Sequence, residues 1–233
     1  MTIKNRIGHR HVFGILVPDF NSVVEPELAD MRIAGVSNQT TRFPLDASVL
    51  ENLASAAERL QPSGVQSWVV GLATDPFPNG LELMNQGVEL LRERIGLPVH
   101  TASHAVPDAL AHLGVNRIGL VTPFDDAGNE RVRETYAERG FAVQAIVGLA
   151  RPGFDQIAST TDAETLAAFS EVAGSGAEAL VQVGTGLPTL HLIEELEKKH
   201  ERAVVTSNQA SYWQALRAAG IGDVVPGAGR LLR

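Results

Sequence analysis

The stretch FGILVP at residues 13–18 returns 105 residues later as IGLVTP at residues 118–123. Each is an apolar run that stops at a proline, a pattern typical of a buried strand followed by a loop. Further pairs follow in the same order, at offsets between 105 and 111 residues. They are VVGLAT (69–74) with LVQVGT (180–185), PVHTASHA (98–105) with AVVTSNQA (203–210), and ALAHLGV (109–115) with ALRAAGI (215–221). Four matches in one order predict two homologous halves.

Strand-like and helix-like patterns alternate between these repeats. Strands are predicted at residues 12–17, 67–72, 117–122, 179–183 and 202–205, and helices at residues 47–60, 81–95, 128–139, 162–173 and 190–199. Such alternation predicts parallel sheets covered on both faces, with ligands at the carboxyl ends of the strands. We therefore predict an α/β protein of two pseudo-symmetric parallel-sheet halves around one central cleft. The first half comprises residues 1–115 plus 207–233, and the second comprises residues 116–206.

The composition excludes several classes of function. A net charge of −8 over 233 residues argues against nucleic-acid binding. The absence of cysteine excludes disulfides, thiolate catalysis and cysteine-bound metals. No apolar stretch approaches the roughly 20 residues of a membrane helix, and no secretory signal is recognisable, so we expect a cytoplasmic protein that does not bind membranes.

The loops after the predicted strands hold the candidate binding residues. Most of these loops end in Ser, Thr, Asn or Asp before a helical run, which is typical of helix N-caps. A helix N-terminus binds anions through free N–H groups, so two facing sets of loops suit a small dicarboxylate. Asn21, Thr74 and Thr185 lie in these loops, and each also has a purely structural interpretation, Thr74 and Thr185 as N-caps and Asn21 as a turn residue.

Two other kinds of site are disfavoured. The sequence GTG at residues 184–186 lacks the third glycine of a dinucleotide loop, because Pro188 and Thr189 follow it. The seven histidines show no metal-ligand spacing, so no metal and no cofactor are expected. His104 is the histidine in a predicted cleft-facing loop.

Three motifs together resemble the Asp/Glu racemase superfamily, in its branch that holds maleate cis-trans isomerase and arylmalonate decarboxylase. They are VPDFNSVVEPEL (17–28), TPFDDAGNE (122–130) and VVTSNQASYWQALR (204–217), and the resemblance extends over residues 12–217. It implies an Asp/Glu racemase-like fold with one cleft for a small carboxylic acid, in a monomer or homodimer.

The chain differs from this branch at the positions of the branch's catalytic residues. The resemblance places the two facing cysteines of racemases and isomerases at Ala73 and Gly184, and the tyrosine of the isomerase turn at Phe124. Neither alanine nor glycine replaces a thiolate, so the usual chemistry of the family is excluded. The expected substrate-binding residues are those of the matching loops: Asn21, Ala73, Thr74, Phe124, Asn129, Gly184, Thr185 and Gly186.

Three hypotheses follow. In the first, the protein is an enzyme acting on a small carboxylic acid or carbonyl compound by hydration, hydrolysis or decarboxylation. Asp75 or His104 is then the general base that activates a water, and His104→Ala abolishes turnover. In the second, the protein is a non-catalytic binding or regulatory protein that kept the cleft. In the third, Ala73 is an engineered replacement for a nucleophile. Asp75 and His104 facing the cleft would favour the first hypothesis, and their facing away would favour the second.

Overall fold

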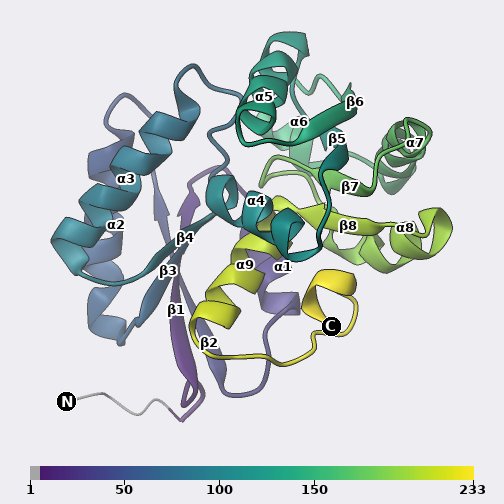
Figure 1. Cartoon of the computed structure of the whole chain (residues 1–233). Coiled ribbons are helices and arrows are strands. Elements are labelled where there is room, and N and C mark those ends of the chain that lie inside the picture. The colour runs from purple at the N-terminus through teal and green to yellow at the C-terminus, as the bar shows by residue number, and fades with distance from the viewer. Residues whose placement is uncertain (1–5) are drawn as a thin grey trace.

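Two four-stranded parallel sheets form the framework of this computed structural model, which describes residues 6–233 (Figure 1). The strand order is β2-β1-β3-β4 in the first sheet and β6-β5-β7-β8 in the second. The strands are β1 (His11–Pro18), β2 (Val36–Phe43), β3 (Ser67–Val70), β4 (Val99–Thr101), β5 (Arg117–Thr122), β6 (Ala142–Gly148), β7 (Ala179–Gln182) and β8 (Ala203–Thr206). In each sheet the first strand along the chain lies between the second and the third, and the fourth lies at the edge beside the third. The two sheets therefore share one topology, which confirms the two pseudo-symmetric halves predicted from the repeat.

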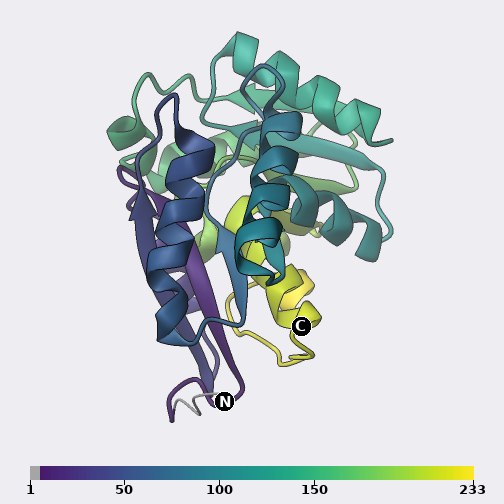
Figure 2. The same cartoon turned by 90° about the vertical axis from the view of Figure 1, so that its left-hand side faces the viewer.

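Helices cover both faces of each sheet. They are α1 (Val24–Asp30), α2 (Val49–Leu60), α3 (Gly80–Ile95), α4 (Ala102–His112), α5 (Asp126–Glu138), α6 (Phe154–Ala158), α7 (Asp162–Ala173), α8 (Ile193–His200) and α9 (Ser207–Ala218), with 3-10 turns η1 (Gln61–Ser63), η2 (Leu190–Leu192) and η3 (Arg230–Leu232). Helices α2 and α3 lie side by side over the outer face of the first sheet (Figure 2).

The equivalent helices α4 and α9 pack against each other between the sheets (Figure 1). Helix α9 also contacts β3 and β4 of the first sheet, and α4 contacts β8 of the second. Each helix therefore touches the sheet of the opposite half. The division of the chain into residues 1–115 plus 207–233 and residues 116–206 remains a prediction.

Matched glycines let the central strands approach their neighbours closely. Gly14 of β1 faces Trp68, whose ring would lie 2.3 Å from any Cβ at that position. Gly119, its equivalent in β5, faces Val172 of α7, whose Cβ would lie 3.0 Å away. A side chain at either position would displace buried neighbours in a close-packed core. The glycine that the repeat preserves thus has the same packing role in both halves.

The sequence analysis missed the edge strands β2 and β6. The side chains of β2 alternate poorly and are mostly half-buried, and those of β6 are exposed or half-buried. An edge strand is paired on one side only, so it does not need the continuous apolar run that marks a central strand. The short strand β4 and the helices α1, α4 and α6 were also not predicted.

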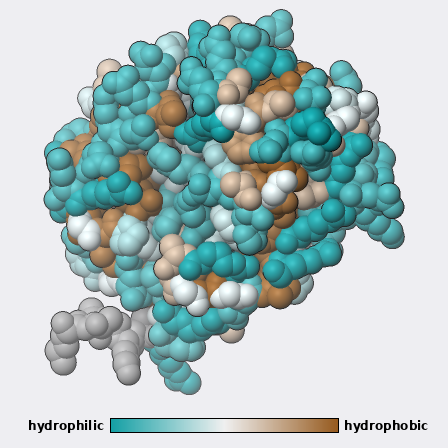
Figure 3. Space-filling model, viewed as in Figure 1, coloured by the Kyte–Doolittle hydropathy of each residue, from teal (hydrophilic) through white to brown (hydrophobic). Residues whose placement is uncertain are grey.

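Hydrophilic residues dominate the face shown in Figure 3, with hydrophobic residues gathered in separate patches. Within residues 6–233, no helix is both long enough and apolar enough to cross a membrane.

Candidate functional site

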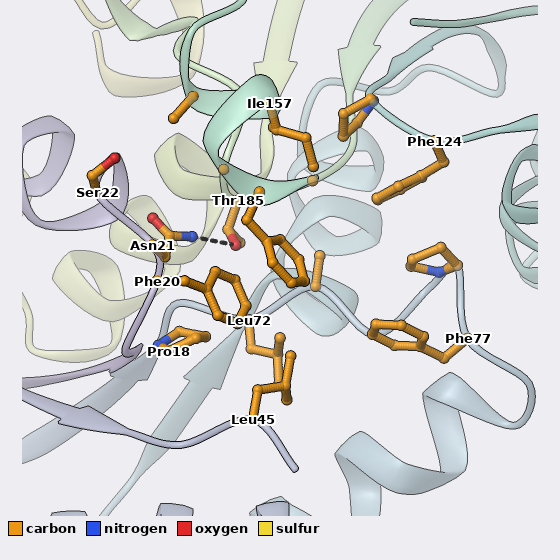
Figure 4. Close-up of a pocket in the computed structure, with 17 residues that line it drawn as sticks. Pro18, Phe20, Asn21, Ser22, Leu45, Leu72, Phe77, Phe124, Ile157 and Thr185 are labelled. Atoms are coloured by element: carbon orange, nitrogen blue, oxygen red, sulfur yellow. Dashed lines mark hydrogen bonds between the residues drawn. The ribbon is translucent and has the colours of Figure 1, made fainter. Parts of the chain in front are cut away.

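A cavity of about 60 Å³ lies where the carboxyl ends of β1, β3, β5 and β7 meet (Figure 4). It is lined by loops from both halves: Pro18, Phe20, Asn21, Ser22, Leu45, Leu72, Ala73, Pro76, Phe77, Pro123, Phe124, Phe154, Ile157, Ala158, Gly184, Thr185 and Gly186. This is the predicted central cleft, at the edge where parallel sheets bind ligands. Its lining is largely apolar, and among residues 6–233 no charged side chain contributes to it.

The polar side chains of the cleft hydrogen-bond to one another across the two halves. Asn21 donates from Nδ2 to Thr185 Oγ1 over 3.2 Å (Figure 4). Its Oδ1 accepts from the N–H groups of Val23 and Val24, which begin helix α1. Thr185 Oγ1 in turn donates to the carbonyl of Gly71 over 3.1 Å. Asn21 and Thr185 therefore join the halves at the floor of the cleft and leave few side-chain groups to bind a charged ligand.

The backbone at Gly184 excludes any side chain. Its φ is +120°, in the region that favours glycine. A Cβ there would lie 2.9 Å from Pro123 Cδ and 3.3 Å from Phe124 Cζ. The Gly184 N–H donates to Ser207 Oγ over 3.0 Å, which fixes this conformation. The position that the resemblance assigns to a cysteine is thus filled by the neighbouring proline and phenylalanine.

Ala73 lies opposite, in the loop after β3, and lines the cleft while being 8% exposed. Of the two positions that the resemblance assigns to cysteines, it is the one with a Cβ in the cleft.

Thr74 and Thr185 do not cap helices, which corrects the expected helix-terminal anion sites. Helix α3 begins at Gly80 after Asn79, and the turn η2 begins at Leu190 after Thr189. Each threonine is followed by several residues of loop before the next helical turn. Thr74 does not line the cleft, and its buried Oγ1 has no hydrogen-bond partner within residues 6–233. Caps do occur elsewhere, because Asp125 caps α5 and Thr206 caps α9.

Asn129 also lies outside the lining and holds the turn after β5. Its Oδ1 accepts from Thr122 Oγ1 over 2.5 Å, and its Nδ2 donates to the Phe124 carbonyl over 3.4 Å. These bonds orient the turn that carries the Phe124 ring into the cleft.

The structure places Asp75 behind the cleft rather than in it. Asp75 is 4% exposed, and its carboxylate accepts from Ser103 Oγ over 3.1 Å. Burial raises the pKa of Asp75, an effect that the hydrogen bonds and the charge of Arg139 oppose. Tyr136 is buried nearby, and its pKa lies well above the ordinary value because of burial and the charge of Asp75. Asp75 therefore belongs to a buried polar cluster between α4 and α5.

His104 lies on the other side of α4, in a separate surface hollow bordered by His100, Arg92 and Gln214. Its Nδ1 is 2.7 Å from Thr101 Oγ1, and its Nε2 is 2.9 Å from Asn85 Oδ1. Burial lowers the pKa of His104, so its ring is neutral near pH 7. Asp75 and His104, the two expected general bases, therefore do not line the cleft.

The mouth of the cleft is aromatic. Phe20, from the loop after β1, stacks on Phe154 of α6. Phe20 and Phe154 are 37% and 47% exposed, and Phe77, which also lines the cleft, is 40% exposed. Large exposed aromatic side chains gathered at one pocket mark a binding region.

The sequence analysis also missed the role of Glu27, the second glutamate of the EPEL segment. Its buried carboxylate accepts from the N–H groups of Thr189 (2.8 Å) and Leu190 (2.9 Å) and from Asn208 Nδ2 (2.7 Å). Burial raises the pKa of Glu27, and these bonds oppose the rise. Asn208 also donates to the Thr185 carbonyl, so Glu27 anchors the loop that forms one wall of the cleft.

The other missed lining residues follow the missed edge strands. Leu45 comes after β2, and Phe154, Ile157 and Ala158 come after β6. Figure 4 shows that Leu45 and Ile157 lie on opposite sides of the cleft. Recognising β2 and β6 would have predicted their loops to reach this edge. No group of three or more His, Asp or Glu side chains suited to a metal ion occurs within residues 6–233.

Comparison with known proteins agrees with this geometry. The family model described as arylmalonate decarboxylase matches residues 14–232. An arylmalonate decarboxylase from Bordetella bronchiseptica is 34% identical over 222 residues, which cover 93% of this chain and 91% of that protein. A maleate isomerase from Pseudomonas putida is 25% identical over 252 residues, which cover 100% of this chain and 98% of that protein.

Solved structures have the same fold. A double mutant of arylmalonate decarboxylase in its liganded form superposes with a TM-score of 0.84 at 27% identity, covering 95% of this chain and 98% of that one. The maleate isomerase of Nocardia farcinica superposes with a TM-score of 0.82 at 23% identity, covering 96% and 98%. In that isomerase structure a succinylcysteine intermediate is covalently bound.

Proposed function

Because the chain belongs to the arylmalonate decarboxylase family, we propose that its central cleft binds a small carboxylic acid with an apolar substituent and decarboxylates it without a thiolate. The relatives of this chain include a decarboxylase and an isomerase, and the proposal therefore starts from enzymatic activity. The substrate class and the reaction are the proposal.

The observation that carries the proposal is the apolar lining at Ala73 and Gly184. Leu72, Pro123, Phe124 and other carbon-rich side chains surround these two positions. An arylmalonate offers an aryl group that such a lining accepts by the hydrophobic effect. Maleate has no comparable apolar part, so the cleft favours the first class of acid.

Decarboxylation is the reaction that an apolar lining favours. A carboxylate that enters the cleft loses hydration, whereas the carbon dioxide it releases is neutral. The C–C bond electrons of R–CH(COO⁻)₂ then form the enediolate R–CH=C(O⁻)₂. Backbone N–H groups of Thr185 and Gly186, which donate no hydrogen bond within residues 6–233, are suited to stabilise this charge. Water supplies the proton and gives R–CH₂–COO⁻ and hydroxide, because no lining side chain is an acid.

A second candidate is supported by a specific observation. Neither Asp75 nor His104 lines the cleft, and a cleft without a general base fits a non-catalytic protein that binds the same acids. Both candidates share the ligand and differ in turnover.

A single reporter thiol tests the shared part. The wild-type chain has no cysteine, so Ala73→Cys introduces one unique thiol at the cleft. We expect phenylmalonate to slow alkylation of this thiol by iodoacetamide, and maleate to slow it less. The matched control is Ser63→Cys, in the exposed turn η1, whose alkylation should not respond to either acid.

Proton NMR of phenylmalonate with the wild-type protein in deuterated water then separates the candidates. Formation of deuterated phenylacetate supports the decarboxylase, whereas protection without turnover supports the binding protein. If no acid protects the thiol introduced by Ala73→Cys, both candidates are wrong.

A further inference from the structure

A groove of about 420 Å³ adjoins the mouth of the cleft and is continuous with it. The two share Pro76, Phe77, Phe124, Phe154 and Ile157 in their linings. Beyond these apolar residues the groove changes character, because two arginines border it. A ligand that reaches the cleft from this side passes the arginines first.

Arg131, on helix α5, has a guanidinium without an acidic partner. Its Nη1 donates to the carbonyls of Pro76 (3.2 Å) and Ala127 (3.3 Å), and it forms no ion pair within residues 6–233. The carbonyl of Pro76 belongs to the first half, so the side chain reaches across to the opposite loop. A guanidinium has five N–H donors in a planar fork. Two carbonyl bonds from one nitrogen leave donors for a carboxylate.

The second arginine, Arg151, borders the same groove. It pairs with Glu164, but its buried Nε has no hydrogen-bond partner within residues 6–233. Asp125, the acid that borders the same groove, is engaged as the cap of α5, where it accepts from the Gly128 N–H over 2.8 Å.

The guanidinium of Arg131, unpaired among the described residues, matters because the protein as a whole is acidic. The chain carries a net charge of −8, which repels anions approaching from solution. No charged side chain of the described residues lines the cleft itself. A cation at its mouth counteracts this repulsion and raises the local concentration of anions.

From these contacts we infer that Arg131, assisted by Arg151, forms a docking subsite for the carboxylate of the incoming ligand at the mouth of the cleft. The inference rests on the proposed function, because it takes the ligand to be a small carboxylic acid. Arg131 acts on binding and not on bond breaking, so it is a positioning residue.

Two probes of the same shape test it: phenylacetate, which carries the charge, and phenylacetamide, which does not. Binding of both is measured by calorimetry at low and at high salt. In Arg131→Gln the dissociation constant of phenylacetate should rise about threefold to tenfold at low salt and much less at about 0.5 M salt, where exposed charges are screened. The dissociation constant of phenylacetamide should stay within about twofold of wild type.

Two variants keep the test specific. Arg131→Lys retains the charge but not the fork, and it should restore most of the affinity for phenylacetate. Arg133→Gln is the matched control on the same helix, because Arg133 pairs with Glu130 and does not border the groove. It should leave both ligands unaffected.

The outcomes distinguish the two proposals. If both probes bind and Arg131→Gln changes neither or both equally, the docking subsite is wrong while the cleft stands. If neither probe binds the wild-type protein, the proposed function fails, and the docking subsite fails with it.

Discussion

Phe20 and Phe154 stack with ring centroids 3.5 Å apart and planes inclined by 15°, one ring from each half of the molecule. Both rings line the cleft, so their contact closes part of its mouth. We therefore predict that this pair limits ligand access to the cleft.

Removing one ring of this pair should open the cleft. In a protein that carries the Ala73→Cys reporter, Phe154→Ala is expected to raise the alkylation rate by iodoacetamide about threefold or more, because the local opening step becomes easier. Val224→Ala, at a residue that is 57% exposed and outside the cleft, is the control. An unchanged rate in Phe154→Ala would show that reagents reach Ala73 by another path.

Gly184 should resist replacement more than a glycine in open space. Gly184→Cys combines a positive φ with close contacts to Pro123 and Phe124, and we expect a loss of about 3 kcal/mol in the free energy of unfolding. Gly176→Ala is the matched control, because Gly176 has a φ of +83° and no neighbouring atom within 4 Å of a Cβ. It should lose only about 1 kcal/mol. Urea denaturation measures both, and equal losses would mean that the contacts around Gly184 relax.

Glu27 should be important for stability through the loop it anchors. Glu27→Gln places an amide donor where the carboxylate accepts from Thr189, Leu190 and Asn208. We expect a loss of about 1–3 kcal/mol in the free energy of unfolding, because a buried donor is left unsatisfied. Glu25→Gln on the same helix removes only an exposed pair with Arg42 and should cost less than about 1 kcal/mol. Similar losses in the two variants would contradict the anchoring role.

Asp75 should make stability depend on pH. Its pKa is raised from the ordinary value of 3.8, so the folded state binds the proton more tightly than the unfolded state. The free energy of unfolding then falls as pH rises from about 3.8 through the folded-state pKa. Asp75→Asn removes this dependence while keeping an acceptor for Ser103. Its stability relative to wild type should therefore increase with pH between pH 4 and 8 in urea denaturation, and a constant difference would falsify the assignment.

His104→Ala should leave ligand binding unchanged. The ring contacts Thr101 and Asn85 in a separate hollow and does not line the cleft. The dissociation constant of phenylmalonate and any turnover should stay within about twofold of wild type. Abolished turnover with unchanged stability would return His104 to the mechanism that the sequence predicted.

The central part of the fold was predictable because the repeat occurs in buried strands. The predicted strand at residues 117–122 coincides with β5, and the predicted helix at residues 162–173 coincides with α7. The strand β5 is a continuous buried run, and the helix α7 buries residues at helical spacing, namely Thr165, Ala168, Phe169 and Val172. The edge strands β2 and β6 and the loops after them carry no such pattern, so Leu45, Phe154 and Ile157 were not anticipated in the cleft.

The sequence by itself determined the two α/β halves, the family and the loss of thiolate chemistry. These follow from repeated motifs and from the absence of a residue type, which need no coordinates. Only the tertiary structure decided which loop residues face the cleft. Asp75 directly follows Thr74 in a loop at the correct edge of the sheet, yet its side chain packs against Ser103 behind the cleft. The direction of a loop side chain depends on backbone dihedrals and on contacts with residues distant in sequence, and local sequence does not specify either.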